Sequence, residues 1–593
     1  MNARRYTVLT APLLALALAA CGGGSQDASE TLESAATPAV APADLVLRGG
    51  KVATVDPALG NVEAIAVNGY QITAVGGNDE ISAYIGPLTE VIELDGRFVM
   101  PGFIEGHGHL FSLGESKLIL DLTEVSGWDE IVSMVAVAAD KTRPGEWIKG
   151  RGWHQEKWDS TPENAVEGLP QHASLSAASP ANPVYLEHAS GHASFVNEAA
   201  MEVIGIDDDT PDPPGGTIVR NTEGKATGMM REISNRIAER AVIEYEKRLS
   251  PAEIEALDRE RIRLASEEAL RNGVTSFHDA GESSRPSFPL FELLKIMEDE
   301  GSLPVRYYMM VRTQTNEELD ELLPHYRAVA EGNDFLTIRA IKRQMDGALG
   351  THGAWLLEPY IDLPDTDGLV LETVEDIERT AEIAVKHGFQ LGVHAIGDRA
   401  VRETLDMYAR VWKAAGVDGK ELRWRIEHAQ HIDAADVPRF GEMGVIPAMQ
   451  GVHATSDGPW IPSRLGEERS KITSYPWRDL INTGAIIANG TDTPVEKIDP
   501  IASFYSSVSR MTIKGERFNP EHVMTREEAL STYTLNSAYA AFEEDIKGTL
   551  TPGKYADIVV LSQDLLTVEE DKIPETTVDI TIVGGEIKYR REM

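Results

Sequence analysis

The sequence is nearly free of cysteine, because Cys21 is the single one among 593 residues. No intramolecular disulfide can form, and any bound metal must be held by His, carboxylates or a less usual ligand. Basic residues are also scarce, with 55 Lys and Arg against 95 Asp and Glu. Nucleic-acid binding requires clustered Lys and Arg, so we expect no nucleic-acid partner. Beyond the N-terminus no apolar run reaches 18 residues, which predicts a soluble body.

The N-terminal residues are typical of a bacterial secretory signal. Two arginines precede a short apolar run over 8–20. The run ends in Leu-Ala-Ala-Cys21, which resembles the lipobox of bacterial lipoproteins, where the cysteine is acylated. We therefore predict a lipoprotein signal peptide over 1–20 and a flexible tether over 21–43, with a membrane anchor at Cys21. The implied location is the bacterial cell envelope, facing the periplasm or the exterior. An ordinary signal peptide with an accidental cysteine is the alternative.

Strand-like segments lie at both ends of the body. Residues 44–100 and 548–593 contain short runs of alternating apolar and polar residues, separated by Gly, Asn or Asp. Each segment is too small for a domain, so we predict that the two pair as one β-sandwich. Residues 101–547 alternate β-rich runs with helical stretches, which predicts an α/β fold with a TIM-like (β/α)8 barrel. Residues from about 111 to 249 break this rhythm and are predicted to form a long insertion after strand 1. The eight predicted barrel strands are 98–105, 274–278, 305–311, 336–345, 390–395, 423–429, 445–450 and 485–489.

Polar side chains gather at the predicted ends of the barrel strands, where the catalytic residues of such barrels lie. Residues i and i+2 of a strand face the same way, so His107 and His109 can reach one ion. Alternation places Lys342 on the inward, apolar face of strand 4. Taken singly, each has a structural alternative, such as a hydrogen-bonded core histidine or a solvated lysine. The occurrence of all these residues at predicted strand ends favours a functional site at the barrel mouth. The other members are His394 on strand 5, His428 on strand 6 and Asp492 after strand 8.

The order His-x-His, Lys, His, His, Asp on successive strands resembles the amidohydrolase superfamily. The surrounding residues narrow the resemblance to its amidohydrolase-3, YtcJ-like branch, which includes N-substituted formamide deformylases. Two departures, Thr351-His352 after the Asp-Gly motif and Gln450-Gly451 on strand 7, lie where substrate is expected and leave its identity open. The resemblance runs from residue 45 to the C-terminus. Matching stretches include MPGFIEGHGHL (100–110), IKRQMDGALGTHGAWLLEPY (341–360), LGVHAIGDRA (391–400), RIEHAQHI (425–432) and NGTDTPVE (489–496).

The resemblance implies a divalent metal centre, and we expect two zinc ions. Lys342 would be carboxylated by CO₂, because a protonated lysine cannot ligate a metal. Imidazole and carboxylate ligands also suit manganese and iron, so the sequence does not fix the metal. The implied ligands are His107, His109 and Asp492 for the more buried ion and His394 and His428 for the second, with Lys342 as the bridge.

The implied chemistry is hydrolysis of a carbon–nitrogen bond by metal-activated hydroxide. A divalent ion lowers the pKa of its bound water to about 7. Asp492 would take the proton of the attacking water and pass it to the leaving amine. His431 and His192 are the candidates for stabilising the oxyanion. We therefore predict an amidohydrolase whose substrate is a small-molecule N-substituted amide or formamide.

Two alternatives stay open. One is a mononuclear deaminase of the same fold, in which Lys342 would be dispensable. The other is a non-catalytic surface binding lipoprotein. A homodimer is compatible with barrels of this type, although the sequence reveals no interface.

Further residues are interpreted less directly. Asp398 and Arg399 are predicted to form an internal ion pair, and Arg464 and Arg469 are candidates for binding a substrate carboxylate. Aromatic residues in the insertion either line an apolar substrate pocket or form the core of a subdomain. These aromatics are Trp147, Trp153, Trp158 and Tyr185.

Overall fold

The computed structural model describes residues 40–155, 158–188, 193–214, 216–282, 287–329 and 334–592. The predicted signal peptide and Cys21 lie outside these residues, so the lipid anchor and the envelope location stay predictions. The chain divides into the units Met1–Ala41 and Pro42–Met593, and the second contains the fold. Within the described part of the chain, no helix has both the length and the apolar character that a membrane crossing requires.

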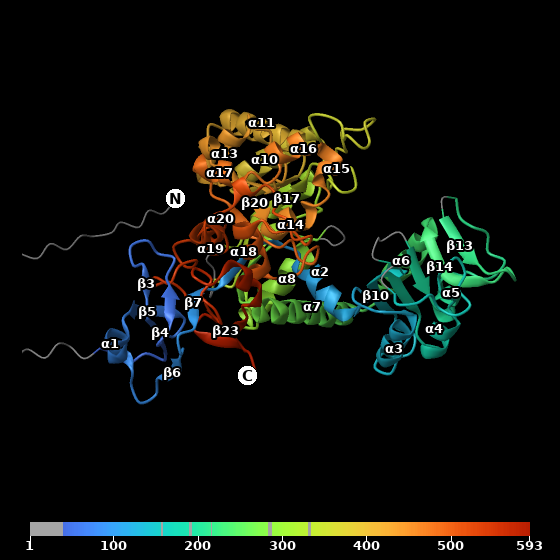
Figure 1. The fold of residues 1–593 in the computed structure, drawn as a ribbon, viewed down its shortest axis with the longest axis horizontal. Helices are drawn as coiled ribbons and strands as arrows, with labels where there is room; N and C mark the ends of the chain where they lie inside the picture. Colours follow the sequence, from blue (N-terminus) through green and yellow to red (C-terminus); the bar gives the residue numbers. More distant parts are fainter. Residues whose placement is uncertain are drawn as a thin grey trace, which may run out of the picture. The chain divides into compact units, whose positions relative to one another are not determined.

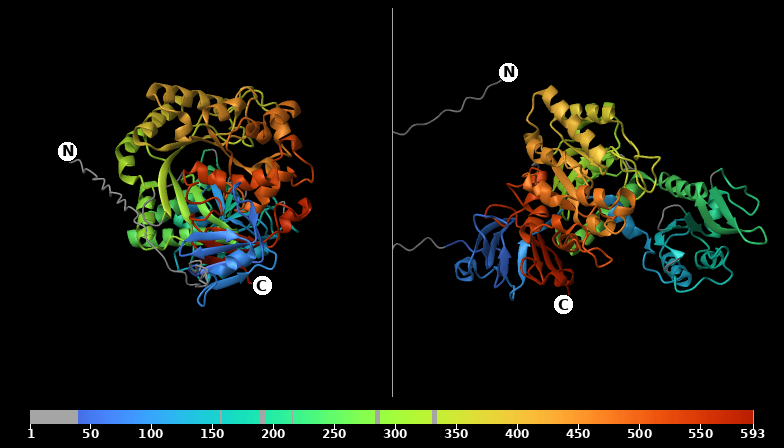
Figure 2. Two further views of the ribbon diagram at one scale, coloured as in Figure 1. Left: turned by 90° about the vertical axis from the view of Figure 1, so that its left-hand side faces the viewer. Right: turned by 45° about the horizontal axis from the view of Figure 1, so that its top comes forward.

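Eight parallel strands form the central barrel, and each pairs with its neighbour in chain order. Helices lie outside these strands (Figures 1 and 2). The predicted TIM-like (β/α)8 barrel is therefore confirmed. Its strands are β8 (Phe103–Gly108), β15 (Val274–Asp279), β16 (Arg306–Val311), β17 (Leu336–Gln344), β18 (Gln390–Ala395), β19 (Arg425–His428), β20 (Ile446–Gln450) and β21 (Ala488–Gly490).

The barrel helices start and stop at residues that suit helix ends. In α7 (Pro251–Arg271), the Ser250 and Glu253 side chains each bind the other's backbone N–H, which satisfies donors that a helix start leaves free. The other helices after β15 are α8 (Ser287–Asp299), α9 (Asn316–Tyr326), α10 (Val374–His387), α11 (Asp398–Ala415), α12 (Gly419–Leu422), α13 (Val437–Met443), α14 (Gly451–Asp457), α15 (Ile461–Leu465), α16 (Glu467–Thr473), α17 (Trp477–Asn482), α18 (Pro500–Ser509), α19 (Arg526–Thr532) and α20 (Leu535–Ala540).

The predicted first barrel strand, 98–105, is two strands in the structure. β7 (Phe98–Pro101) belongs to a terminal sheet, whereas β8 opens the barrel. The break falls at Gly102, where an added Cβ would lie 2.2 Å from the Thr275 side chain. Only glycine lets the backbone pass this close. As a consequence, His107 lies within strand β8 rather than beyond its end.

Strands from the two chain ends form two further sheets, as predicted, and one of these sheets contains strands from both ends. One sheet has the order β24-β23-β22-β7-β2-β3 and joins N-terminal to C-terminal strands, and the other has the order β5-β4-β1-β6 (Figure 1). Apolar side chains of both sheets share one core cluster. The elements are β1 (Leu45–Arg48), β2 (Lys51–Ala53), β3 (Asn61–Val62), β4 (Ala64–Asn68), β5 (Gln71–Gly76), α1 (Asn78–Ile81), β6 (Glu90–Glu93), β22 (Ile558–Leu561), β23 (Val578–Val583) and β24 (Glu586–Arg590).

A buried ion pair fastens the barrel to the C-terminal strands. Arg306 Nε and Nη2 donate to Asp557 at 2.8 and 3.2 Å, and the two residues are 2% and 5% exposed. Asp557→Ala is expected to lower the free energy of unfolding by about 3–5 kcal/mol, because it removes the buried carboxylate of this ion pair. Urea denaturation measures this loss. The control is Glu93→Ala in the exposed Arg48–Glu93 pair, which should cost less than about 1 kcal/mol. Equal small losses in both variants would contradict the expectation.

The segment between β8 and β15 forms helix α2 and then a six-stranded sheet of its own, in the order β13-β14-β12-β11-β10-β9. Trp153 is fully buried there and packs on Phe195, with ring centroids 4.9 Å apart. Trp147 and Tyr185 are buried in a second cluster. These aromatic side chains therefore form hydrophobic cores, as the alternative of a subdomain core predicts. The elements are α2 (Leu110–Leu118), β9 (Leu120–Asp121), α3 (Trp128–Ala139), β10 (Ile148–Trp153), α4 (Ala173–Ala178), β11 (Val184–His188), β12 (Ala193–Val196), α5 (Glu198–Ile204), β13 (Gly216–Arg220), β14 (Ala226–Glu232) and α6 (Ile233–Glu246).

Candidate metal centre

Three side chains from different barrel strands converge at the carboxyl end of the barrel. One ligand atom each of His107 on β8, His428 on β19 and Asp492 after β21 lies within 4.8 Å of the others, and all three residues are buried. Asp492 Oδ1 lies 3.3 Å from His109 Nε2 and 3.6 Å from His107 Nε2. Asp492 Oδ2 lies 4.0 Å from His428 Nδ1. The carboxylate is therefore surrounded by three imidazoles.

Backbone contacts between the first and last barrel strands hold Asp492 in this place. Asp492 N donates to His107 O, and His109 N donates to Thr493 O, both at 2.8 Å. Asp492 has a φ of 58°, in the left-handed region that Asp tolerates better than most residues. A Cβ at Gly490 would lie 2.5 Å from His107 N, so only glycine lets the strands approach this closely.

Lys342 of β17 reaches the same place from the barrel interior. It is 2% exposed, and Nζ lies 3.5 Å from His107 Nε2. Burial, reinforced by the charge of Arg312, lowers the pKa of Lys342 to about 7. Within the described ranges, Nζ forms no ion pair with a carboxylate. Arg343, the next residue, faces the helix layer and donates to Thr380 of α10 at 2.9 Å, as the predicted alternation requires.

His394 of β18 completes the group. Its ring centroid lies 4.5 Å from that of His428. His394 Nε2 is buried without a hydrogen-bond partner among the described residues, and the Asp346 carboxylate is 3.5 Å away. Asp346 accepts three backbone N–H groups, from Trp355, Ile396 and Gly397. Both carboxylate oxygens of Asp346 are therefore already hydrogen-bonded to backbone N–H groups, and these bonds hold the loops around His394 in place.

The protonation states of His107, His394, His428 and Asp492 suit a cation. Burial opposes protonation of His109, but the hydrogen bond to Asp492 outweighs burial and raises the pKa of His109. Burial, with the charge of Lys342, lowers the pKa of His107 to about 4, and burial holds the pKa values of His394 and His428 well below normal. Burial opposes ionisation of Asp492, but the hydrogen bond to His109 and the neighbouring imidazoles outweigh it and keep its pKa low. Neutral imidazoles and an ionised carboxylate are the forms that bind metals. These nitrogen and oxygen ligand atoms fit a divalent ion. His394 Nε2 fits it as well, because it has no hydrogen-bond partner among the described residues.

Two further residues contact the Nδ1 atoms of proposed ligand histidines, and the sequence motifs do not reveal either of them. Glu427 Oε2 accepts a hydrogen bond from His107 Nδ1, and Gln450 Oε1 lies 2.9 Å from His428 Nδ1. Burial opposes ionisation of Glu427, yet Arg425 and His107 hold its pKa below the ordinary value. Strand alternation provides one signal, because Arg425 and Glu427 share a face of β19. Alternation does not show which residues Arg425 and Glu427 contact.

Three other histidines bear on the predicted oxyanion site. His431 is buried, with Nδ1 3.0 Å from Ser474 Oγ, and its Nε2 has no hydrogen-bond partner in the described part of the chain. His453, which was not singled out in the sequence, has its ring centroid 6.3 Å from that of His428 and a similarly partnerless Nε2. His192 lies outside the described residues.

The predicted ion pair between Asp398 and Arg399 is wrong. Arg469 Nη2 donates to both Asp398 carboxylate oxygens, at 3.0 and 2.8 Å. Consecutive residues at the start of helix α11 point in different directions, so Arg399 instead lies over the Trp355 ring. Arg469 is thereby engaged within the protein. Arg464 is engaged as well, through an ion pair with Asp362.

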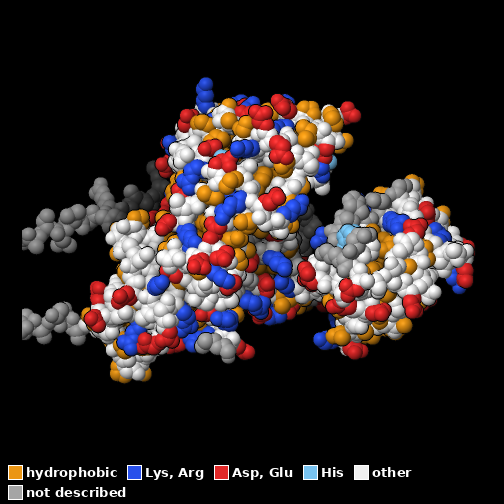
Figure 3. Space-filling model, in the orientation of Figure 1, with side chains coloured by type: hydrophobic (Ala, Val, Ile, Leu, Met, Phe, Trp, Pro, Cys, Tyr) orange, Lys and Arg blue, Asp and Glu red, His pale blue; other side chains and the backbone are white. Residues whose placement is uncertain are grey.

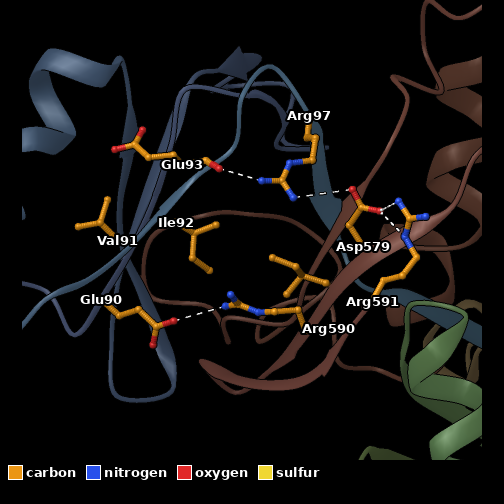
Figure 4. A pocket seen from close by; sticks show the side chains of 9 residues that line it. Glu90, Val91, Ile92, Glu93, Arg97, Asp579, Arg590 and Arg591 are labelled. Carbon is orange, nitrogen blue, oxygen red and sulfur yellow. Dashed lines mark hydrogen bonds and ion pairs between the residues drawn. The ribbon is translucent and has the colours of Figure 1, made fainter. Parts of the chain in front are cut away.

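The charged groups that line a cavity away from the barrel mouth are paired with one another. A cavity of about 200 Å³ lies between the edge strand β6 and strands β23 and β24 (Figure 4). Arg97 and Arg591 lie 3.8 and 2.7 Å from Asp579, and Arg590 lies 3.4 Å from Glu90. These pairs leave little net charge to hold an anion. On the face shown in Figure 3, basic side chains are interspersed with acidic ones.

The barrel and its buried His and Asp cluster define a metal-dependent hydrolase. The chain belongs to the amidohydrolase-3 family, because the model described as "Amidohydrolase family" matches residues 90–589. The chain is 32% identical over 566 residues to the protein LONG AFTER FAR-RED 3 of Arabidopsis thaliana, covering 94% of each chain. The putative amidohydrolase YtcJ of Bacillus subtilis is 29% identical, over 92% of this chain and 99% of that one.

An N-substituted formamide deformylase of Arthrobacter pascens is 25% identical, over 92% of this chain and 98% of that one. Among solved structures, an uncharacterized metal-dependent hydrolase from Pyrococcus horikoshii matches with a TM-score of 0.69 and 27% identity. That match covers 89% of this chain and 99% of the other. The protein is thus a metal-dependent amidohydrolase that acts on carbon–nitrogen bonds.

Proposed function

We propose that this hydrolase cleaves an N-substituted amide or formamide at a centre of two divalent ions, with zinc as the expected metal. The observation that carries the proposal is the buried convergence of His107, His428 and Asp492, with Lys342 Nζ 3.5 Å from His107 Nε2. The similarity to an N-substituted formamide deformylase supports the substrate class. A small-molecule amide is the proposed substrate.

The proposed ligands divide between the two ions. Lys342 would hold both ions as a carbamate: neutral Nζ attacks CO₂, an N–C bond forms, a proton is released, and one negative charge is shared by two oxygens. The burial of Lys342 without a carboxylate partner in the described ranges supports this assignment, because an uncompensated buried ammonium is unfavourable. His107, His109 and Asp492 would hold the first ion, and His394 and His428 would hold the second.

A divalent ion at this place supplies a Lewis acid for the scissile carbonyl and lowers the pKa of bound water. The protein supplies the proton transfer: Asp492 holds the proton of the attacking water and delivers it to the leaving nitrogen. Its position beside His107, His109 and His428 supports this role. His431, through its buried Nε2, is proposed to donate to the developing oxyanion. His192 remains the alternative donor.

Metal removal tests the proposal. Protein produced with zinc and bicarbonate is expected to contain about two zinc ions per chain and to hydrolyse at least one of a panel of N-formyl, N-acyl and aminoacyl amides. Dialysis against a chelator should abolish hydrolysis, and added zinc should restore it. Metal content is measured by plasma mass spectrometry on the preparation used for the assays. Full activity in metal-free protein would contradict the proposal.

A further inference from the structure

Behind the proposed ligands, Glu427 makes a contact that determines how one of them can act. We infer that Glu427, held in place by Arg425, is a positioning residue that fixes which ring nitrogen His107 presents to the metal. The inference rests on the proposed ligand role of His107. It adds a contribution that the ligand set does not include, because Glu427 is not a proposed ligand and contacts the ring of one.

The two nitrogens of the His107 ring face different partners. Nδ1 is hydrogen-bonded to Glu427 Oε2. Nε2 lies 3.5 Å from Lys342 Nζ and 3.6 Å from Asp492 Oδ1. The relative exposures of His107 and Glu427 are both 0%, so water does not compete for either contact. The ring is therefore fixed between a single acceptor on one side and the proposed metal ligands on the other.

Arg425 keeps Glu427 charged and in place. Arg425 Nη2 donates to Glu427 Oε2 at 2.9 Å, and Arg425 Nε lies 2.7 Å from Oε1. The same Nη2 donates at 2.7 Å to the carbonyl of Gly106, the residue before His107. A guanidinium does not lose its charge in proteins. Arg425 thus links β19 to β8 and aligns both the carboxylate and the backbone of the histidine that it holds.

The charge of Glu427 determines the tautomer of His107. An ionised carboxylate accepts hydrogen bonds and donates none. Nδ1 of a neutral His107 must then carry the proton, which leaves the Nε2 lone pair directed toward Lys342 and Asp492. The negative charge behind the ring also strengthens the imidazole as a ligand. An amide at position 427 could present its NH₂ to Nδ1 and favour the opposite tautomer.

His428 provides an internal comparison. Its Nδ1 lies 2.9 Å from Gln450 Oε1, and Gln450 Nε2 donates to Ala448 O at 3.2 Å, which orients the amide. His428 is therefore positioned by a neutral group, whereas His107 is positioned by an anion. We expect the loss of Glu427 to weaken the metal bound through His107 in particular.

The first experiment measures zinc affinity in the full-length Glu427→Gln protein by competition with a chromophoric chelator. Glu427→Gln is expected to raise the zinc dissociation constant about 10- to 100-fold. Glu105→Gln is the matched control, because Glu105 is also fully buried on β8 and accepts from Thr491 and from the backbone N of His107, but contacts no imidazole ring. Its zinc affinity should change little. Thermal unfolding of the metal-free proteins checks that each variant folds.

The outcomes separate this inference from the proposed function. Wild-type protein that binds no zinc would overturn both. Wild-type protein that binds zinc, together with Glu427→Gln protein of equal affinity, would overturn only the role of Glu427. An equal loss of affinity in the Glu105→Gln control would also overturn it, because the effect would then not depend on contact with the ring.

A second measurement needs no variant of Glu427. In metal-free protein labelled with [¹⁵N]histidine, long-range ¹H–¹⁵N correlation distinguishes the two neutral tautomers. The His107 signals are identified by their loss in His107→Gln protein. We expect His107 to carry its proton on Nδ1. A proton on Nε2 would overturn the inference even if Glu427→Gln protein does not fold.

Discussion

Asp492→Asn is expected to abolish most turnover while leaving most of the metal in place. The amide keeps an oxygen that can serve as a ligand, but it cannot take a proton from water and pass it to the leaving nitrogen. Loss of a general acid–base group should reduce kcat about 10²- to 10⁴-fold. The kcat for the best amide of the panel and the zinc content should be measured on one preparation.

Asp279→Asn is the control for the loss of a buried carboxylate at the barrel mouth. Asp279 accepts from Leu110 N at 3.0 Å and from Gly281 N at 2.6 Å, and it makes no hydrogen bond to an imidazole among the described residues. We expect this variant to lose stability and to keep a kcat far closer to that of the wild type. Unchanged turnover in Asp492→Asn would remove Asp492 from the mechanism. A proportional loss of zinc and kcat would make it a ligand only.

The order of the barrel strands could be predicted from the sequence because each strand is a local pattern. An apolar run followed by His, Lys or Asp marks the carboxyl end of a strand, and parallel strands bring these ends together. The division of residues 98–105 into β7 and β8 could not be predicted in the same way. β7 pairs with β22 near the C-terminus, and that pairing depends on residues far away in the chain.

The gathering of the proposed ligands at the barrel mouth could be predicted for the same reason, whereas their supporting contacts could not. His107 and Glu427 are 320 residues apart in the sequence, and spacing gives no information about such a pair. The predicted partner of Asp398 was wrong because the prediction relied on proximity in the sequence. Its neighbour Arg399 was the obvious partner, but Arg469 reaches it from a distant helix. Local pattern thus predicts which groups reach the centre, and tertiary packing determines what holds them.

Lys342→Ala is expected to cost the protein one of its two metal ions together with its activity. The variant removes the proposed bridging oxygens, so the ion held by His394 and His428 would lose a ligand. Metal content should fall to about one ion per chain, and kcat should fall at least about 10²-fold. A mononuclear deaminase would instead keep its metal and its activity in this variant. The experiment therefore decides between the proposed function and its main alternative.

Two companion variants identify which property of Lys342 matters. Arg343→Ala removes a cation from the same strand, but Arg343 faces helix α10, so two ions and most of the activity should remain. Lys342→Arg keeps a positive charge at the site and cannot form the carbamate. If the lysine acted as a cation, this variant would retain metal and turnover. We expect it to lose both as Lys342→Ala does, because the bridge requires an anionic oxygen donor that a guanidinium cannot provide.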